Sequence, residues 1–290
     1  MSIKRPKYVY NNNVKSFSNL LKYCNLINVK KVIYASSSAV YSDVRNTNET
    51  TKIKNLKSIY AKTKFENEKI AKFYIENKKM NIIGLRYFNV YGPYCKIKGK
   101  NLPVISNWIK SIMYNQDIQL YGSKEQTRDF IYVKDVVKIN IAMALSKNLE
   151  FIYNVGTGRE TKLVNLLTKI KNKIKKYKNT SSEVIILSKR TGDIRNSKAN
   201  TKRIFHEFNI KNKKLVNLDL GLNKTIKYFL NKWKKKIYIG GGFSDDQLIW
   251  VIPIIANLLK KNKNTELFFE NKISKKITNN KIIRKYLKNF

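Results

Sequence analysis

The sequence has few cysteines, few acidic residues and one histidine, and each shortage excludes a class of protein. Its two cysteines, Cys24 and Cys95, are far apart and lack metal-ligand spacing. This argues against a disulfide scaffold, predicts no metal site and suits a reducing cytoplasm. The single histidine, His206, lies outside every motif described below, so we interpret it as structural or surface.

Long apolar runs are also missing. The longest, residues 248–259, contains about a dozen residues and includes Pro253, whereas a membrane-spanning helix needs about 20. The first residues carry no apolar stretch typical of a signal peptide. We therefore expect no membrane span and a cytoplasmic location.

Basic residues are in large excess, with 60 Lys and Arg against 19 Asp and Glu and a net charge of +41. Such a charge is typical of proteins that bind nucleic acid or anionic membranes. Here, however, only nine of the basic residues are Arg, and they are spread along the chain without interleaved aromatic residues. We expect no specific nucleic-acid partner, only nonspecific binding at low salt.

Alternating helical and apolar segments predict an α/β fold. Residues 7–28 carry apolar side chains at helical spacing and lead into the apolar run at residues 32–35. A second buried strand that runs into a turn is expected over residues 82–93. It follows a helix expected from residue 60 to residue 77, with Phe65, Ile70, Phe73 and Tyr74 in the core. Strands that are apolar throughout are buried on both faces, as in a parallel sheet covered by helices.

A candidate proton-transfer site lies around Tyr60 and Lys64. The two residues are four apart, so on a helix they share one face. An ammonium next to a phenol favours the phenolate, a useful acid-base group. Ser38 follows the first predicted strand, and sites in open α/β sheets lie at the carboxyl ends of strands. These three residues are the predicted catalytic group.

Six segments extend this pattern along the chain. In order they are SSSAVY (36–41), YAKTK (60–64), LRYFNVYGP (85–93), QTRDFIYVKDV (126–136), YNVGTG (153–158) and RTGD (190–193). Together they resemble the NAD-dependent nucleotide-sugar epimerase/dehydratase family, a group of extended short-chain dehydrogenase/reductases. The resemblance covers about residues 1–235.

The resemblance implies a role for each matching residue. Ser38 and Tyr60 are the catalytic pair, and Lys64 holds the nicotinamide ribose and favours the Tyr60 phenolate. Asn13 and Phe88 lie on the cofactor side. The implied contacts to the diphosphate, sugar and nucleotide of the substrate are Asn89, Asn101, Leu102, Arg128, Arg190 and Asp193. Arg suits a phosphate because its planar donors bind two oxygens at once.

The implied chemistry is NAD-dependent epimerisation of a UDP-sugar through a keto sugar. Dehydratases of this family carry Asp-Glu directly after the catalytic hydroxyl residue, where this chain has Ala39 and Val40. Neither side chain can move a proton, which favours an epimerase acting on UDP-glucose, UDP-N-acetylglucosamine or a uronate. Family members are often dimers, so the resemblance also implies a homodimer through the helix that bears Tyr60.

The chain departs from the family in its cofactor half. No GxxGxxG turn precedes Tyr60, so we expect a partial Rossmann-like sheet that lacks N-terminal βα units. This leaves an alternative open, a catalytically inactive module that binds sugar nucleotides. The predicted domains are residues 1–100, a Rossmann-like half with the catalytic residues, then 101–235, mostly substrate-binding with returning Rossmann elements. Residues 236–290 are expected to form a βαβ-like tail, the start of an unrelated domain.

Simpler interpretations of single residues also stay open. Residues 36–38 are consistent with ordinary hydroxyls at a strand end. Arg128 and Asp129 are consistent with an internal ion pair, and Phe88 with a core residue.

Overall fold

The computed structural model describes residues 5–42, 44, 47–95, 102–147, 150–189, 193–208, 215–232, 235–239 and 265–269. The chain divides into two compact units, Met1–Ile226 and Lys227–Phe290. Each is described by itself, and the domain boundary predicted near residue 100 stays a prediction. Within the described segments, every helix is too short or too polar to cross a bilayer.

A parallel sheet of three strands lies at the centre of the first unit. Its order is β1 (Val32–Ser37), β2 (Ile82–Tyr87) and β7 (Ile152–Val155). In the register, Ser37 lies opposite Tyr87, and Tyr87 lies opposite Val155. The three strands therefore end together, and the residues that follow them leave the sheet at one edge. The predicted α/β architecture is confirmed.

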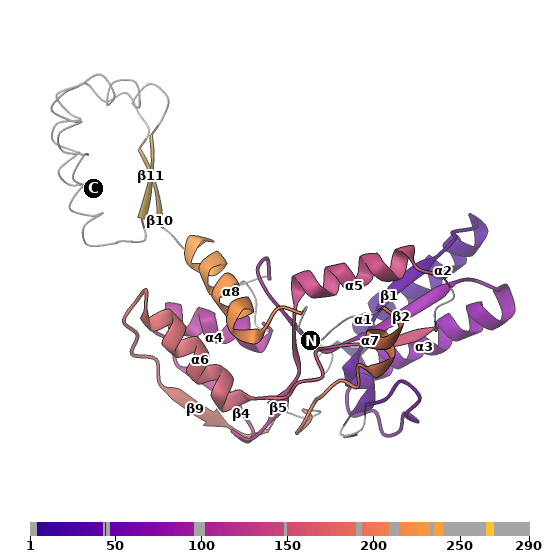
Figure 1. The fold of residues 1–290 in the computed structure, drawn as a ribbon, viewed down its shortest axis with the longest axis horizontal. Coiled ribbons are helices and arrows are strands. Elements are labelled where there is room, and N and C mark those ends of the chain that lie inside the picture. The colour runs from indigo at the N-terminus through magenta and orange to yellow at the C-terminus, as the bar shows by residue number, and fades with distance from the viewer. Residues whose placement is uncertain are drawn as a thin grey trace. The chain divides into compact units, whose positions relative to one another are not determined.

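Helices cover both faces of this sheet (Figure 1). On one face, α2 (Ser16–Leu26) and α3 (Ile59–Lys78) bury side chains such as Leu21 and Ala71 against Val32 and Ile82. On the other face, α5 (Val133–Leu145) and α7 (Lys202–Glu207) pack against Ile83 and neighbouring strand residues. Successive strand residues point to opposite faces, so a strand covered on both sides is mostly apolar. Ser36, Arg86 and Asn154 are buried polar residues of these strands.

The N-terminal helical segment is not one regular helix. It consists of α1 (Pro6–Tyr10), the π-helical turn η1 (Asn11–Lys15) and α2. A π-turn is a local widening of the helix, and such turns often occur at functional sites. Here the turn contains Asn13, the predicted cofactor-side residue.

The remaining elements of the first unit form small sheets and further helices. Strands β3 (Asn89–Tyr91) and β6 (Phe130–Tyr132) pair in parallel, as do β4 (Ile118–Tyr121) and β9 (Val184–Leu187). Strands β5 (Thr127–Arg128) and β8 (Thr161–Lys162) pair antiparallel. The other elements are η2 (Ser38–Tyr41), α4 (Val104–Met113) and α6 (Leu163–Lys175).

Helix α8 (Leu218–Lys232) ends the series of described helices. In the second unit, β10 (Lys235–Ile239) and β11 (Thr265–Phe269) pair in parallel. The two strands predicted for the tail are therefore confirmed. The helix predicted between them lies outside the described residues.

One core prediction is wrong. Phe73 on α3 is 52% exposed and stacks edge-on against Tyr74 at the helix surface. The fully buried residues of α3 are instead small or polar, namely Ala61, Thr63, Asn67, Glu68 and Ala71. The helix packs on the sheet through Ala71 and the partly buried Ile70, Tyr74 and Ile75. Glu68 adds buried hydrogen bonds to Ser36 and Arg86 of the sheet.

Candidate active site

The first part of the site is the turn that follows β1. The Ser37 hydroxyl accepts a hydrogen bond from the Ala39 amide (3.2 Å) and so caps the short helix η2. This cap turns the chain out of the sheet directly after the strand. Ser38, the first residue of η2, therefore lies half-buried at the carboxyl end of β1.

The second part is the first two turns of α3. Ser58 caps this helix by accepting a hydrogen bond from the Ala61 amide (3.0 Å). Tyr60, in the first turn, is 39% exposed, and the Lys64 Nζ lies 5.8 Å from the centroid of its ring. Lys64 also donates to the Ala35 carbonyl of β1 (2.8 Å). The expected helical pairing is confirmed, and the ammonium joins the Tyr60 ring to the strand end.

Burial lowers the pKa of Lys64 below its ordinary value. A lysine ammonium has three N–H donors, of which one is used on Ala35. The group is thus partly desolvated, close to a phenol, and able to donate to further acceptors. These are the properties needed to hold ribose hydroxyls and to stabilise a nearby phenolate.

Asn13 lies against the same turn of α3. Its side-chain amide donates to the Thr63 hydroxyl (3.0 Å), which in turn donates to the Tyr60 carbonyl (2.8 Å). The predicted cofactor-side residue is therefore tied to the helix that carries the predicted acid-base residue.

Phe88 follows β2, the neighbour of β1. Only 5% of its surface is exposed, and it packs in a cluster with Val40, Tyr41 and Ala199. Its amide donates to the Val155 carbonyl (3.0 Å). This contact fits the simpler interpretation as a core residue and also places Phe88 at the same sheet edge as Ser38, so its role toward a cofactor stays a prediction.

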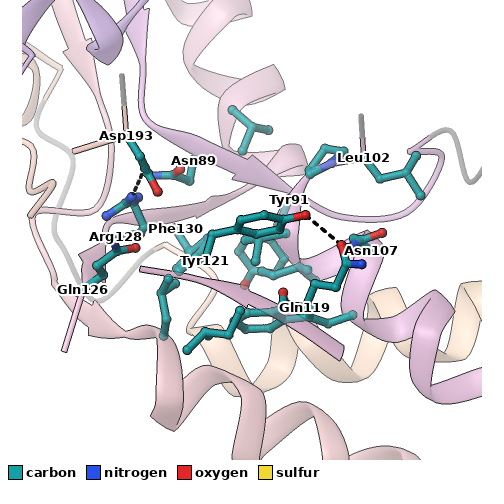
Figure 2. A pocket seen from close by; sticks show the side chains of 17 residues that line it. Asn89, Tyr91, Leu102, Asn107, Gln119, Tyr121, Gln126, Arg128, Phe130 and Asp193 are labelled. Carbon is teal, nitrogen blue, oxygen red and sulfur yellow. Dashed lines mark hydrogen bonds and ion pairs between the residues drawn. The ribbon is translucent and has the colours of Figure 1, made fainter. Parts of the chain in front are cut away.

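A cavity of about 370 Å³ is lined by Asn89, the residue after Phe88, and by residues of several other segments (Figure 2). Four predicted substrate residues line it: Asn89, Leu102, Arg128 and Asp193. They come from segments that are far apart in the sequence, so the fold brings this predicted group together. Asn101 and Arg190, the other two predicted residues, lie outside the described part of the chain.

Arg128 and Asp193 form an ion pair at one end of this cavity, with 2.6 Å between Nη2 and Oδ1 (Figure 2). The Arg128 Nη1 also donates to the Thr127 carbonyl (2.8 Å) and the Arg195 carbonyl (3.2 Å). The Arg128 side chain is 10% exposed. Backbone and carboxylate therefore hold a cation in a fixed orientation at the cavity wall.

The simpler interpretation in which Arg128 and Asp129 form an internal ion pair is wrong. The Asp129 carboxylate accepts from the amides of Thr157 (2.9 Å), Gly158 (2.8 Å) and Ala199 (3.1 Å). Burial raises its pKa, while these hydrogen bonds oppose the rise. Asp129 thus joins the loop at Thr157 and Gly158 to the loop at Ala199. It does not pair with Arg128 because adjacent residues of an extended segment point in opposite directions.

The sequence analysis missed the other side chains of the cavity. Aromatic rings from β3, α4, β4 and β6 contribute Tyr91, Trp108, Tyr121 and Phe130. Apolar strand patterns give no sign that a ring faces a cavity rather than a core. Gln126 was also missed, although it belongs to a quoted motif; it is 2% exposed, and its Oε1 has no hydrogen-bond partner among the described residues.

The described residues fit the nicotinamide ribose of NAD, because Ser38, Tyr60 and Lys64 offer hydroxyl and ammonium groups at a strand end. The sequence contains no GxxGxxG turn for the pyrophosphate. No cluster of three potential metal ligands occurs in the described segments.

Comparison with known proteins agrees with this geometry. The model of the NAD dependent epimerase/dehydratase family matches residues 1–156. The chain belongs to this family.

Individual relatives are similar to this chain over most of its length. Protein CapI of Staphylococcus aureus is 28% identical over 256 residues, covering 81% of this chain and 73% of CapI. A UDP-N-acetylglucosamine 4-epimerase from Methanobrevibacter ruminantium, solved with UDP-N-acetylmuramic acid, is 31% identical with a TM-score of 0.72, covering 80% of this chain and 73% of that one. A UDP-glucose 4-epimerase from Thermus thermophilus, solved with NAD, is 27% identical with a TM-score of 0.66. The match covers 79% of this chain and 73% of that one.

Proposed function

We propose that this member of the family interconverts a UDP-sugar and its C4 epimer with NAD as cofactor. The observation that supports the proposal is that Lys64 contacts the Tyr60 ring and donates to the Ala35 carbonyl of β1, the strand that Ser38 follows. The cavity that contains Arg128 opens beyond the end of the adjacent strand. In this proposal, the proton-transfer residues and the cavity with its fixed cation act at the same sheet edge.

In the proposed mechanism, Tyr60 as phenolate takes the proton from the C4 hydroxyl, and Ser38 hydrogen-bonds the same oxygen. Lys64 stabilises the phenolate by its charge. NAD, when bound, supplies the acceptor and later the donor of the C4 hydride. After the keto sugar has rotated in the site, the hydride returns to the opposite face of C4 and Tyr60 returns the proton to the C4 oxygen, which gives the C4 epimer.

Arg128 is the proposed contact to the substrate diphosphate, since two carbonyls and the Asp193 carboxylate fix its positive charge at the cavity wall. Asp193 is the proposed contact to the ribose. The aromatic walls suit a nucleobase, because rings provide apolar area and stacking. Bound UDP-N-acetylmuramic acid in the Methanobrevibacter relative supports a UDP-sugar as the substrate class.

The residues after Ser38 favour epimerisation over loss of water. Val40 is fully buried in the cluster with Tyr41 and Phe88, and Ala39 has no polar side-chain atom. Elimination of water needs an acid and a base next to the sugar, and this segment supplies neither.

A Tyr60→Phe variant tests the proposal. With NAD and UDP-sugar present, we expect the rate of C4 epimerisation to fall about 10²- to 10⁴-fold, while the dissociation constant for UDP measured by calorimetry stays unchanged. The matched control is Tyr177→Phe, which removes an exposed phenol and should leave both values unchanged. Binding of UDP-sugar without turnover in the unaltered chain would instead support the binding-module alternative.

A further inference from the structure

A single buried guanidinium joins the two elements that carry Ser38 and Tyr60. Arg86 lies on β2 and is 3% exposed. It binds the Glu68 carboxylate of α3 with two parallel hydrogen bonds, Nε to Oε1 (2.9 Å) and Nη2 to Oε2 (2.7 Å). Its third nitrogen, Nη1, donates to the Tyr41 hydroxyl of η2 (2.8 Å). One side chain therefore bonds both α3 and η2.

On the α3 side, Glu68 belongs to the same helical stripe as the proposed catalytic residues. Tyr60, Lys64 and Glu68 are each four residues apart and so share one face. Lys64 donates to the Ala35 carbonyl, and the next residue, Ser36, donates its hydroxyl to Glu68 (2.5 Å). Two successive turns of α3 are thus bonded to two successive residues of β1, which fixes both the rotation and the height of the helix.

On the η2 side, Tyr41 lies three residues after Ser38, one turn along the short helix. Its hydroxyl receives the Arg86 bond and donates to the Asn154 Oδ1 (2.8 Å). Tyr41 is 2% exposed. Its phenol thus attaches the turn that carries Ser38 to both β2 and β7.

The charges of this network are costly to bury. Burial by itself lowers the pKa of Arg86, but the hydrogen bonds and charge of Glu68 raise it above its ordinary value, so Arg86 stays a cation. A buried ion pair is commonly no more stabilising than apolar side chains of the same volume. Apolar side chains, however, do not fix a separation between two elements as directional hydrogen bonds do.

We propose that Arg86 is a positioning residue, which sets the separation of Ser38 and Tyr60 by bonding Tyr41 and Glu68 at once. The roles of Ser38 and Tyr60 rest on the proposed function, whereas the bridge between η2 and α3 can be tested without turnover.

The test compares Tyr41→Phe with Tyr153→Phe in the full chain. Both remove a buried, hydrogen-bonded phenol, but Tyr153 bonds Glu207 and Glu150 outside this network. We expect Tyr41→Phe to speed hydrogen exchange of the Tyr41 and Ser42 amides about tenfold. We also expect kcat for epimerisation to fall between about 10- and 100-fold with KM for the UDP-sugar unchanged, since a misplacement of about 1 Å costs up to 10²-fold in rate. Tyr153→Phe should change neither value.

Arg86→Lys provides the second variant, because an ammonium keeps the charge but not the fork that reaches both partners. It should speed exchange in η2 and also in the first two turns of α3. The proposal would be overturned if Arg86→Lys speeds exchange in only one of these elements. It would also be overturned if Tyr153→Phe has the same effects as Tyr41→Phe, or if KM rises without a fall in kcat. If the unaltered chain shows no turnover, the proposed function fails, and the exchange data still decide whether Arg86 bridges the two elements.

Discussion

Two cations of the site are held in different ways, and the difference predicts how each responds to substitution. Lys64 has a lowered pKa because of burial and bonds one carbonyl. Arg128 is fixed by an ion pair and two carbonyls. The first is suited to act on a neighbouring phenol, and the second to bind a fixed anion.

Lys64→Met should change how stability depends on pH. A base whose folded pKa lies below its unfolded value of about 10.4 binds fewer protons in the folded state. Between those two pKa values, the unfolded state therefore binds more protons, and the free energy of unfolding rises with pH. We expect urea unfolding to show that the free energy of unfolding of the wild type rises relative to that of Lys64→Met between pH 7 and pH 10. A difference that is constant across this range would show that Lys64 keeps an ordinary pKa.

Arg128→Lys should weaken UDP binding at least about tenfold, because hydrogen bonds to charged groups contribute about 1.5–3 kcal/mol and lysine lacks the planar fork. Calorimetry with UDP measures the change. Arg203→Lys is the control, since Arg203 donates to the Ile152 carbonyl (3.3 Å) and does not line the cavity. Equal affinities of wild type and Arg128→Lys would remove Arg128 from the binding site.

At the scale of elements, the C-terminal end of α5 is bonded by a lysine from a distant segment. Helix α5 ends at Leu145, and the Lys31 Nζ donates to the carbonyls of Met143 (3.2 Å), Ala144 (3.1 Å) and Ser146. Lys31 directly precedes β1. This cap therefore joins the start of β1 to the helix on one face of the sheet.

Lys31→Met should lower the free energy of unfolding by about 0.5–2 kcal/mol, because it leaves the last carbonyls of α5 without their donor and removes a charge that is favourable at a helix C-terminus. Urea unfolding followed by circular dichroism measures this. Lys30→Met, an exposed neighbour, should have little effect. Equal losses for both variants would contradict the assignment of Lys31 as the cap.

Local patterns could be predicted from the sequence, and distant pairings could not. Helical spacing correctly placed Tyr60 and Lys64 on one face, since that geometry depends only on a four-residue step. The Arg128–Asp193 and Arg86–Glu68 pairs join separate elements, and nothing in local spacing selects one carboxylate among many. Phe73 was expected in the core because it is aromatic, whereas the inward face of α3 holds residues that bond the sheet.

At the scale of the whole molecule, we expect the net charge of +41 to act through a long-range field. Such a field attracts any polyanion and is screened by salt. The cavity differs, because its cation Arg128 is only 10% exposed and is held within hydrogen-bonding distance of its partners.

Duplex DNA should accordingly bind at low salt without sequence preference, with the logarithm of affinity falling linearly as the logarithm of salt concentration rises. Fluorescence anisotropy with two unrelated duplexes checks this. UDP affinity should change far less over the same salt range. A DNA affinity that survives about 0.5 M salt, or that favours one duplex, would show a specific nucleic-acid site.

The proposed epimerisation is tested most directly by product formation. The chain is incubated with NAD and, in separate reactions, UDP-glucose, UDP-N-acetylglucosamine or UDP-glucuronate, and proton NMR follows the appearance of the C4 epimer. The account predicts a C4 epimer from at least one of these sugars with the wild type and Tyr177→Phe, and none above background with Tyr60→Phe. No epimer from any of the three with the wild type at saturating NAD, or equal product from Tyr60→Phe, would contradict it.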